Sequence, residues 1–143
     1  MAPGRLRHGV GPPTALLGAG AFLAVYGLLR PGSDGLDRLG VRDRVVALGP
    51  CRIPGLLLDL GAYPGLVDGA GEVAGDLLRL KDADAGRLLD AFEDFDPSAP
   101  ATSEYVRRRV RLVAPKVWAW VYAWNGDAEG RATVAGGDWL MRG

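Results

Sequence analysis

The chain has 143 residues, with 17 basic and 17 acidic side chains, one histidine and one cysteine. This length suits one domain with a core of its own, and the zero net charge argues against general nucleic-acid binding. The lone histidine, His8, lies among glycines and prolines, so Ser-His-Asp catalysis, Cys-His catalysis and most zinc or iron sites are not expected. Cys51 cannot close an intrachain disulfide by itself, so the fold does not depend on an oxidising compartment and we expect a cytoplasmic protein. If the chain is an enzyme, its acid and base chemistry falls to a carboxylate.

The N-terminal part of the chain allows two interpretations. Residues 1–18 are predicted to form a flexible tail, and residues 19–143 one domain. An uncharged apolar run from Ala15 to Leu29 follows two arginines, which resembles a signal peptide or a short membrane anchor. The run is shorter than the roughly 20 residues that span a bilayer, and it leads into a glycine-rich turn. We therefore predict a buried strand over about Ala21 to Tyr26 and no membrane segment.

Glycine and proline separate the next predicted elements. A short helix is predicted from Ser33 through Leu39, because serine and aspartate satisfy free N–H groups at helix starts. Strands are predicted over Val45–Leu48, Ile53–Leu60 and Glu72–Leu80. Between the last two, the Pro64-Gly65 pair favours a type II turn.

The clearest helix runs from about Asp84 to Phe95, with Asp82 or Asp84 as its cap and Pro97 beyond its end. Its apolar face comprises Ala85, Leu88, Leu89, Phe92 and Phe95, whereas Asp90 and Asp94 point the other way. Glu93 lies at the margin of this face, four residues after Leu89. A partly desolvated carboxylate there has a raised pKa and suits proton transfer near neutral pH. The alternative to a catalytic role is that Glu93 is a boundary residue hydrogen-bonded to a loop.

Two alternating segments follow, Tyr105–Leu112 and Val117–Trp124, and we expect them to pair through Ala114-Pro115-Lys116. One face of the first carries Tyr105, Arg107, Arg109 and Arg111, and one face of the second carries Trp118, Trp120, Tyr122 and Trp124. Arginines beside aromatic rings suggest nucleic-acid binding, but the zero net charge favours a solvated or ion-paired sheet face. The tryptophan row is expected to be core or pocket wall. Residues Gly136–Leu140 are expected to tie the C-terminus back to the sheet.

These elements predict a mixed α+β domain, in which strands outnumber helices and one strong helix packs against a small barrel. The glycine-rich turns between the strands are consistent with that architecture.

Several segments together resemble one known family. The stretch Val25–Gly32, VYGLLRPG, resembles the YGxL signature that opens gamma-glutamylcyclotransferase-like proteins. Further matches follow in the family's order: the LGAYPGLV stretch that ends at Val67, Val73–Leu77, Leu88–Glu93, Tyr105–Arg107 and Trp120–Tyr122. The resemblance covers about Phe22 to Trp139.

The resemblance implies a small mixed β-barrel with flanking helices, and an enzyme that needs no metal and no cofactor. It places the catalytic glutamate at Glu93. It assigns binding of the small gamma-glutamyl substrate to the signature loop, Tyr26, Gly27, Leu28 and Leu29, together with Tyr105, Arg107 and Tyr122. The implied reaction is a cyclisation, in which the substrate's alpha-amine attacks its own side-chain carbonyl and releases 5-oxoproline and an amine or amino acid.

One departure from the family pattern keeps other functions open. The residue after the signature glycine is commonly Ser or Thr, and here it is Leu28, which cannot donate a side-chain hydrogen bond. A non-catalytic ligand-binding domain, or an enzyme diverted to another cyclisation or amide-cleaving reaction, is therefore the alternative. Asp76 stands where the family more often has glutamate. A membrane-tethered protein is the third hypothesis, and it rests only on the N-terminal run.

Overall fold

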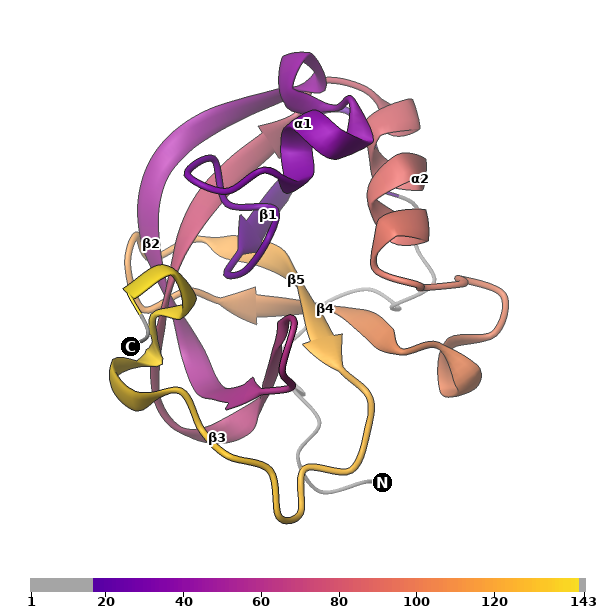
Figure 1. The fold of residues 1–143 in the computed structure, drawn as a ribbon. Coiled ribbons are helices and arrows are strands. Elements are labelled where there is room, and N and C mark those ends of the chain that lie inside the picture. The colour runs from indigo at the N-terminus through magenta and orange to yellow at the C-terminus, as the bar shows by residue number, and fades with distance from the viewer. Residues whose placement is uncertain (1–16, 142–143) are drawn as a thin grey trace.

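The computed structural model describes residues 17–141, which form one mixed α+β unit around a five-stranded sheet (Figure 1). Its strands and helices are β1 (Phe22–Val25), α1 (Gly35–Leu39), β2 (Val45–Asp59), β3 (Pro64–Leu80), α2 (Ala83–Phe92), β4 (Tyr105–Arg111) and β5 (Trp118–Trp124). Short 3-10 turns lie at Arg42–Arg44, Pro100–Thr102, Ala135–Gly137 and Trp139–Met141. The fold class predicted from the sequence, α+β, is confirmed.

The apolar run near the N-terminus contributes a strand and a turn to this unit. The predicted strand is confirmed as β1, which pairs with β3 in antiparallel register from Phe22 with Arg79 to Val25 with Asp76. Most of the predicted tail lies outside the described residues. Leu17, near its end, is only 2% exposed and packs against Gly86 of α2. Within residues 17–141, no helix is long and apolar enough to cross a membrane.

The two longest strands, β2 and β3, form one continuous hairpin that arches across the molecule (Figure 1). The prediction for this hairpin is wrong in two places. The sequence predicted two strands where β2 is one continuous strand, and a turn at Pro64-Gly65, where β3 begins. The glycines that suggested strand ends lie instead at irregularities within the ladder, between Ala47 and Gly49 and between Pro54 and Leu56. Gly49 and Gly55 have φ values of 109° and 140°, which glycine adopts without strain.

The sheet has the order β2-β3-β1-β5-β4 and is open, so the prediction of a small barrel is wrong. β3 is long enough to pair with β1 along one part and with β5 at Leu66 and Ala123 along another. The edge strand β2 forms an isolated bridge at Arg52 with Ala114, which lies in the connection between β4 and β5, and this bridge does not continue as a ladder. A strongly curved sheet therefore encloses the core without closing on itself.

Helix α2 covers one side of this sheet. The Asp82 side chain accepts a hydrogen bond of 2.8 Å from the Ala85 N–H, which confirms the predicted cap. The helix ends at Phe92, earlier than predicted, so Glu93 is the C-cap residue and not part of the last turn. The predicted apolar face is correct at its centre, where Ala85 and Leu89 are fully buried, but Leu88 is 38% exposed.

The strand pair β4–β5 is confirmed, with Tyr105 opposite Trp124 and Arg111 opposite Trp118. The C-terminal segment also returns to the sheet, as the sequence predicted. Trp139 is 2% exposed in the core, and Asp138 forms an ion pair of 2.8 Å with Arg30.

Candidate active site

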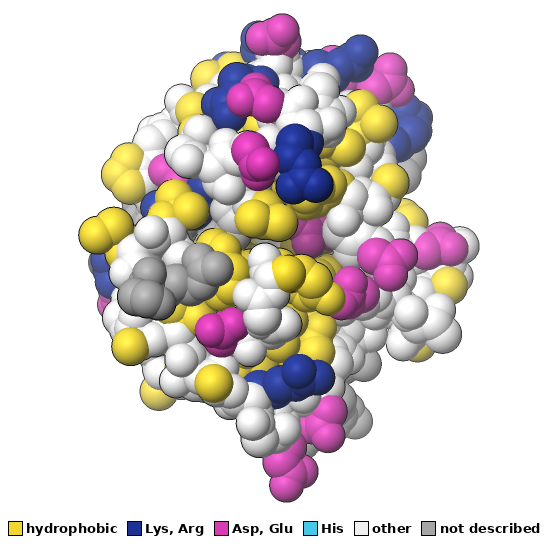
Figure 2. Space-filling view, in the orientation of Figure 1, with side chains coloured by type: hydrophobic (Ala, Val, Ile, Leu, Met, Phe, Trp, Pro, Cys, Tyr) yellow, Lys and Arg dark blue, Asp and Glu magenta, His cyan; other side chains and the backbone are white. Residues whose placement is uncertain are grey.

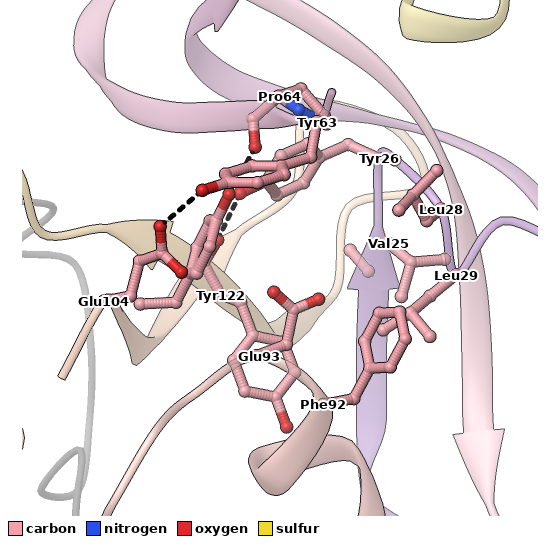
Figure 3. A pocket seen from close by; sticks show the side chains of 13 residues that line it. Val25, Tyr26, Leu28, Leu29, Tyr63, Pro64, Phe92, Glu93, Glu104 and Tyr122 are labelled. Carbon is pink, nitrogen blue, oxygen red and sulfur yellow. Dashed lines mark hydrogen bonds between the residues drawn. The ribbon is translucent and has the colours of Figure 1, made fainter. Parts of the chain in front are cut away.

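A cavity of about 180 Å³ opens where the end of β1, the β2–β3 turn, the end of α2 and the start of β4 meet. The space-filling view shows a hollow on this face, in which atoms of an Asp or Glu side chain lie among hydrophobic side chains (Figure 2). The lining residues are Ala24, Val25, Tyr26, Gly27, Leu28, Leu29, Tyr63, Pro64, Phe92, Glu93, Glu104, Tyr105 and Tyr122 (Figure 3).

The signature loop, Tyr26–Leu29, forms one wall of this cavity. The buried Tyr26 hydroxyl donates a hydrogen bond to the Tyr122 carbonyl and accepts one of 3.1 Å from the Leu66 N–H, which fixes the loop to β5 and β3. Gly27 lies so close to the Pro64 ring that a Cβ atom there would be 2.8 Å from Cγ. Within residues 17–141, the N–H groups of Gly27, Leu28 and Leu29 have no acceptor. Three free donors therefore lie together on one short loop.

Glu93 occupies the opposite wall, at the end of α2, and its carboxylate points into the cavity between Phe92 and the tyrosines (Figure 3). Its backbone N–H donates to the Leu89 carbonyl at 3.0 Å, so the helix end fixes its position. Within the described residues its carboxylate has no hydrogen-bond or ion-pair partner, and the alternative of a loop-bonded boundary residue is not what the structure shows. Burial raises the pKa of Glu93 to about 8, and the nearby Glu104 carboxylate acts in the same direction.

Glu104 and Tyr63 belong to the cavity, although the sequence did not single them out. The Tyr63 hydroxyl donates a hydrogen bond of 2.7 Å to the Glu104 carboxylate (Figure 3). Both residues flank strands, Tyr63 just before β3 and Glu104 just before β4, where sequence periodicity ends. The one available signal was the tyrosine beside the Pro-Gly pair, within a stretch that the family resemblance already covered.

Tyr105 and Tyr122 also line the cavity, but their hydroxyl groups are engaged in the structure. The Tyr105 hydroxyl donates to the Pro64 carbonyl at 2.6 Å, and the Tyr122 hydroxyl donates to Asp90 at 2.7 Å. Burial raises the pKa of both phenols far above the usual value, so they remain protonated. Their rings form walls, and neither hydroxyl is placed to exchange protons with a ligand.

Arg107 does not line the cavity, in contrast to the other residues that the resemblance singled out. It is fully buried behind Tyr122, where its Nε lies 2.7 Å from the Asp90 Oδ1 atom. The expectation that Asp90 points to solvent is therefore wrong, because this carboxylate is 6% exposed and faces β4. The sequence left the arginine row open to nucleic-acid binding or to a solvated or ion-paired sheet face. At Arg107 the row is ion-paired, and the Arg107 guanidinium also lies over the Phe95 and Trp120 rings.

The arrangement can hold a small molecule with one anionic and one cationic group. The three N–H donors suit an anion or a developing oxyanion, and Glu93 suits an ammonium group that must lose a proton. No group of three or more His, Cys, Asp or Glu side chains that could hold a metal ion occurs among residues 17–141.

The fold and the cavity together define a small α+β protein with a carboxylate opposite a glycine-containing loop. Residues 23–141 match the family described as gamma-glutamyl cyclotransferase, AIG2-like, and the chain belongs to this family.

Relatives of known name support the same assignment. The chain is 33% identical over 86 residues, which are 60% of this chain and 68% of the relative, to the gamma-glutamylcyclotransferase family protein YtfP of Escherichia coli K12. It is 32% identical over 118 residues to a protein of Vibrio cholerae serotype O1, covering 82% of this chain and 94% of that protein.

Solved structures show the same fold. The solution structure of E. coli ytfP matches with a TM-score of 0.59 and 29% identity, over 84% of this chain and 96% of that chain. The crystal structure of a mouse AIG2-like protein matches with a TM-score of 0.58 and 19% identity, over 87% and 85% of the two chains. The second match supports the fold alone.

Proposed function

We propose that this protein is a gamma-glutamyl cyclotransferase, in which Glu93 acts as general base and then as general acid. The observation that carries this proposal is the Glu93 carboxylate, which has a raised pKa and no hydrogen-bond or ion-pair partner among residues 17–141, and which lines the same small cavity as the signature loop. The substrate is a small gamma-glutamyl amide. The proposed reaction needs only side chains and backbone groups of this chain.

The reaction is intramolecular, which determines what the cavity must do. The substrate's alpha-nitrogen bonds to its own side-chain carbonyl carbon, the amide C–N bond breaks, and 5-oxoproline and an amine leave. Holding the chain in its ring-closing conformer can give effective molarities on the order of 10⁵ M or more. The apolar and aromatic walls formed by Val25, Phe92 and Tyr122 restrict the ligand to such a folded conformer.

Glu93 supplies the proton transfers. The alpha-ammonium must lose a proton before its nitrogen can attack, and the ionised carboxylate accepts that proton. The same carboxyl then donates this proton to the leaving nitrogen as the C–N bond breaks. The second proton that the ring nitrogen must lose also passes through Glu93 to the released amine, which leaves as an ammonium, so the overall proton count is unchanged. With a pKa of about 8, Glu93 is close to the pKa of an alpha-amino group, which makes the first transfer nearly thermoneutral.

The signature loop supplies electrostatic stabilisation. The N–H groups of Gly27, Leu28 and Leu29 bind the alpha-carboxylate of the substrate or the oxyanion that develops as the ring closes. Leu28 removes a side-chain hydroxyl but leaves its own backbone N–H in place, so this role survives the substitution.

Incubation of the purified protein with a panel of gamma-glutamyl amines and gamma-glutamyl amino acids, followed by measurement of 5-oxoproline, tests this proposal. We expect Glu93→Gln to lower kcat by about 10²- to 10⁴-fold, the usual contribution of a general acid or base. The matched control is Asp94→Asn, an adjacent exposed carboxylate at φ 51°, because asparagine tolerates this backbone conformation. Equal turnover by wild type and Glu93→Gln would remove Glu93 from the mechanism.

The departure at Leu28 favours one second candidate, a domain that binds gamma-glutamyl compounds without turnover. Leu28 lines the cavity and makes this part of the wall apolar. The same panel separates the two functions, since calorimetric binding of several gamma-glutamyl compounds without 5-oxoproline release would identify a binding domain.

A further inference from the structure

The charged side chains of the cavity lining are acidic. Glu93 and Glu104 are its only ionisable side chains besides tyrosine, and the 13 described lining residues include no lysine, arginine or histidine. Two guanidinium groups act on the cavity tyrosines from outside the lining: Arg107, which is paired with Asp90, and Arg131, which lies 5.1 Å from the Trp124 ring centroid. The cavity therefore presents two carboxylates to a ligand.

Glu104 is held rigidly at the cavity wall. Its backbone N–H donates to the Asp94 carbonyl at 3.1 Å, and its own carbonyl accepts from the Asn125 N–H at 2.9 Å. Its carboxylate accepts the Tyr63 hydroxyl, and the Tyr63 ring packs edge-on against Tyr105 with centroids 6.3 Å apart. A carboxylate fixed in this way is poised to interact with a ligand charge, since little side-chain freedom is left to lose.

The gamma-glutamyl part of the substrate has no positively charged group left to pair with Glu104. The gamma-glutamyl part of the substrate carries one ammonium and one carboxylate, which the proposed function places at Glu93 and at the signature loop. A neutral leaving amine adds no charge, and an amino-acid leaving group adds a further carboxylate next to Glu104. Only a leaving group with a second cationic centre balances this carboxylate.

We propose, building on the cyclotransferase function, that Glu104 selects gamma-glutamyl amides whose leaving amine carries a second positive charge, such as the mono-gamma-glutamyl amide of a linear alkyl diamine. The rings of Tyr63 and Phe92 lie on the same cavity, and aromatic faces attract ammonium groups. Leu28 provides an apolar wall for the methylene chain between the two nitrogens. The bonds made and broken are those of the cyclisation above, and the distal ammonium takes no part in them.

Three substrates with different charges on the leaving group test this selectivity: mono-gamma-glutamyl butanediamine, gamma-glutamyl pentylamide and gamma-glutamyl-alanine. The first two are nearly isosteric, with a terminal ammonium replaced by a methyl group. We compare kcat/KM of wild type, Glu104→Gln and the control Glu129→Gln, whose side chain is exposed and does not line the cavity. Removing the Glu104 charge also lowers the pKa of Glu93, but that change affects all three substrates alike and cancels in their ratios.

We expect wild type and Glu129→Gln to prefer the diamine amide over the pentylamide by about tenfold or more, and gamma-glutamyl-alanine to be the poorest substrate. In Glu104→Gln the ratio should fall to within about threefold, mainly through loss of activity on the diamine amide. A ratio unchanged in Glu104→Gln, or equal turnover of the first two substrates by wild type, would overturn the selectivity and leave the cyclotransferase function intact.

Absence of 5-oxoproline from all three substrates would instead overturn the cyclotransferase function, and with it this inference. If Glu104→Gln does not fold, the salt dependence of wild type decides the matter, because screening weakens an interaction between charges and not one between a methyl group and the wall. The preference for the diamine amide should then decrease between low and high ionic strength, and a constant preference would contradict a role for Glu104.

Discussion

Glu93 and Gly27 lie on opposite walls of the cavity. The position of Glu93 depends on the end of helix α2, and that of Gly27 on the absence of a Cβ atom. The end of α2 at Phe92 turns the Glu93 side chain off the helix and into the cavity, away from the exposed Asp94 that follows it. Gly27 allows the signature loop to pass within van der Waals contact of Pro64, because it has no Cβ atom.

Gly27→Ala tests this close approach. The new methyl group would lie 2.8 Å and 3.0 Å from two atoms of the rigid Pro64 ring, so the loop or the ring must move. We expect a loss of about 1–3 kcal/mol in the free energy of unfolding, as for other overpacked sites, and a decrease in kcat/KM of about tenfold or more. Gly18→Ala is the control, because nothing lies within 4 Å of a Cβ atom there. Equal effects of the two substitutions would show that the Gly27 contact is unimportant.

Helix α2 and strands β4 and β5 are joined by a buried polar network centred on Asp90. Its carboxylate accepts from Arg107 Nε and from the Tyr122 hydroxyl, both at 2.7 Å, and all three side chains are almost inaccessible. The Arg107 Nη1 atom has no hydrogen-bond partner within the described residues. Because Glu93 follows Asp90 by three residues, the network also helps to determine where the Glu93 carboxylate is placed.

Arg107→Met is expected to destabilise the protein by about 3–5 kcal/mol, because it leaves the Asp90 charge buried without its cation. The double variant Asp90→Leu, Arg107→Met should recover part of this loss, since it removes both charges. Urea denaturation measures these differences, with Arg87→Met as control: the Arg87–Asp84 pair is exposed and is expected to contribute less than about 1 kcal/mol. An effect of Arg107→Met no larger than that of the control would contradict a structural role for the network.

The elements that the sequence predicted well are those whose pattern is local. The β4–β5 alternation and an aspartate cap at the start of α2 follow from spacing alone, and the structure agrees with both. The network around Asp90 was missed because a buried ion pair and two solvated charges have the same sequence pattern. Only the packing of α2 onto β4 distinguishes them.

The long hairpin and the open sheet were missed for a related reason. Glycine and proline end a strand in most sequences, but in β2 they occupy bulges that bend the strand without ending it. Whether a sheet closes depends on the pairing of its two edges, which lie far apart in the sequence. Glu104 and Tyr63 were likewise hidden, because each lies in a connection where no periodicity marks it.

At the scale of the whole molecule, the raised pKa of Glu93 connects its proposed catalytic role with the stability of the fold. Its pKa is about 8 in the folded protein and 4.5 as the reference value for an unfolded chain. Folding therefore disfavours the ionised form, so the stability contributed by the protonated carboxyl is complete below pH 4.5 and is lost as the pH rises through 8.

Thermal melts of wild type and Glu93→Gln check this linkage. Glutamine resembles the protonated carboxyl, so the two Tm values should be close at pH 4.5. The Tm of Glu93→Gln should exceed that of wild type by an amount that increases from about pH 4.5 to about pH 8 and is constant at higher pH. Glu129→Gln, with its exposed side chain, should show no such trend. A Tm difference that does not change with pH would mean that Glu93 has an ordinary pKa.

The pH dependence of kcat/KM for one gamma-glutamyl substrate, measured on wild type and Glu104→Gln, tests most directly whether Glu93 is the base. We expect activity in wild type to rise with pH to a midpoint near 8, and the midpoint to move to lower pH in Glu104→Gln, because the Glu104 charge raises the pKa of Glu93. The substrate's own ammonium titrates identically with both proteins, so a difference in midpoint reports the enzyme. Activity that is independent of pH between about 5 and 9, or the same midpoint in both proteins, would contradict a catalytic role for Glu93 in this cavity.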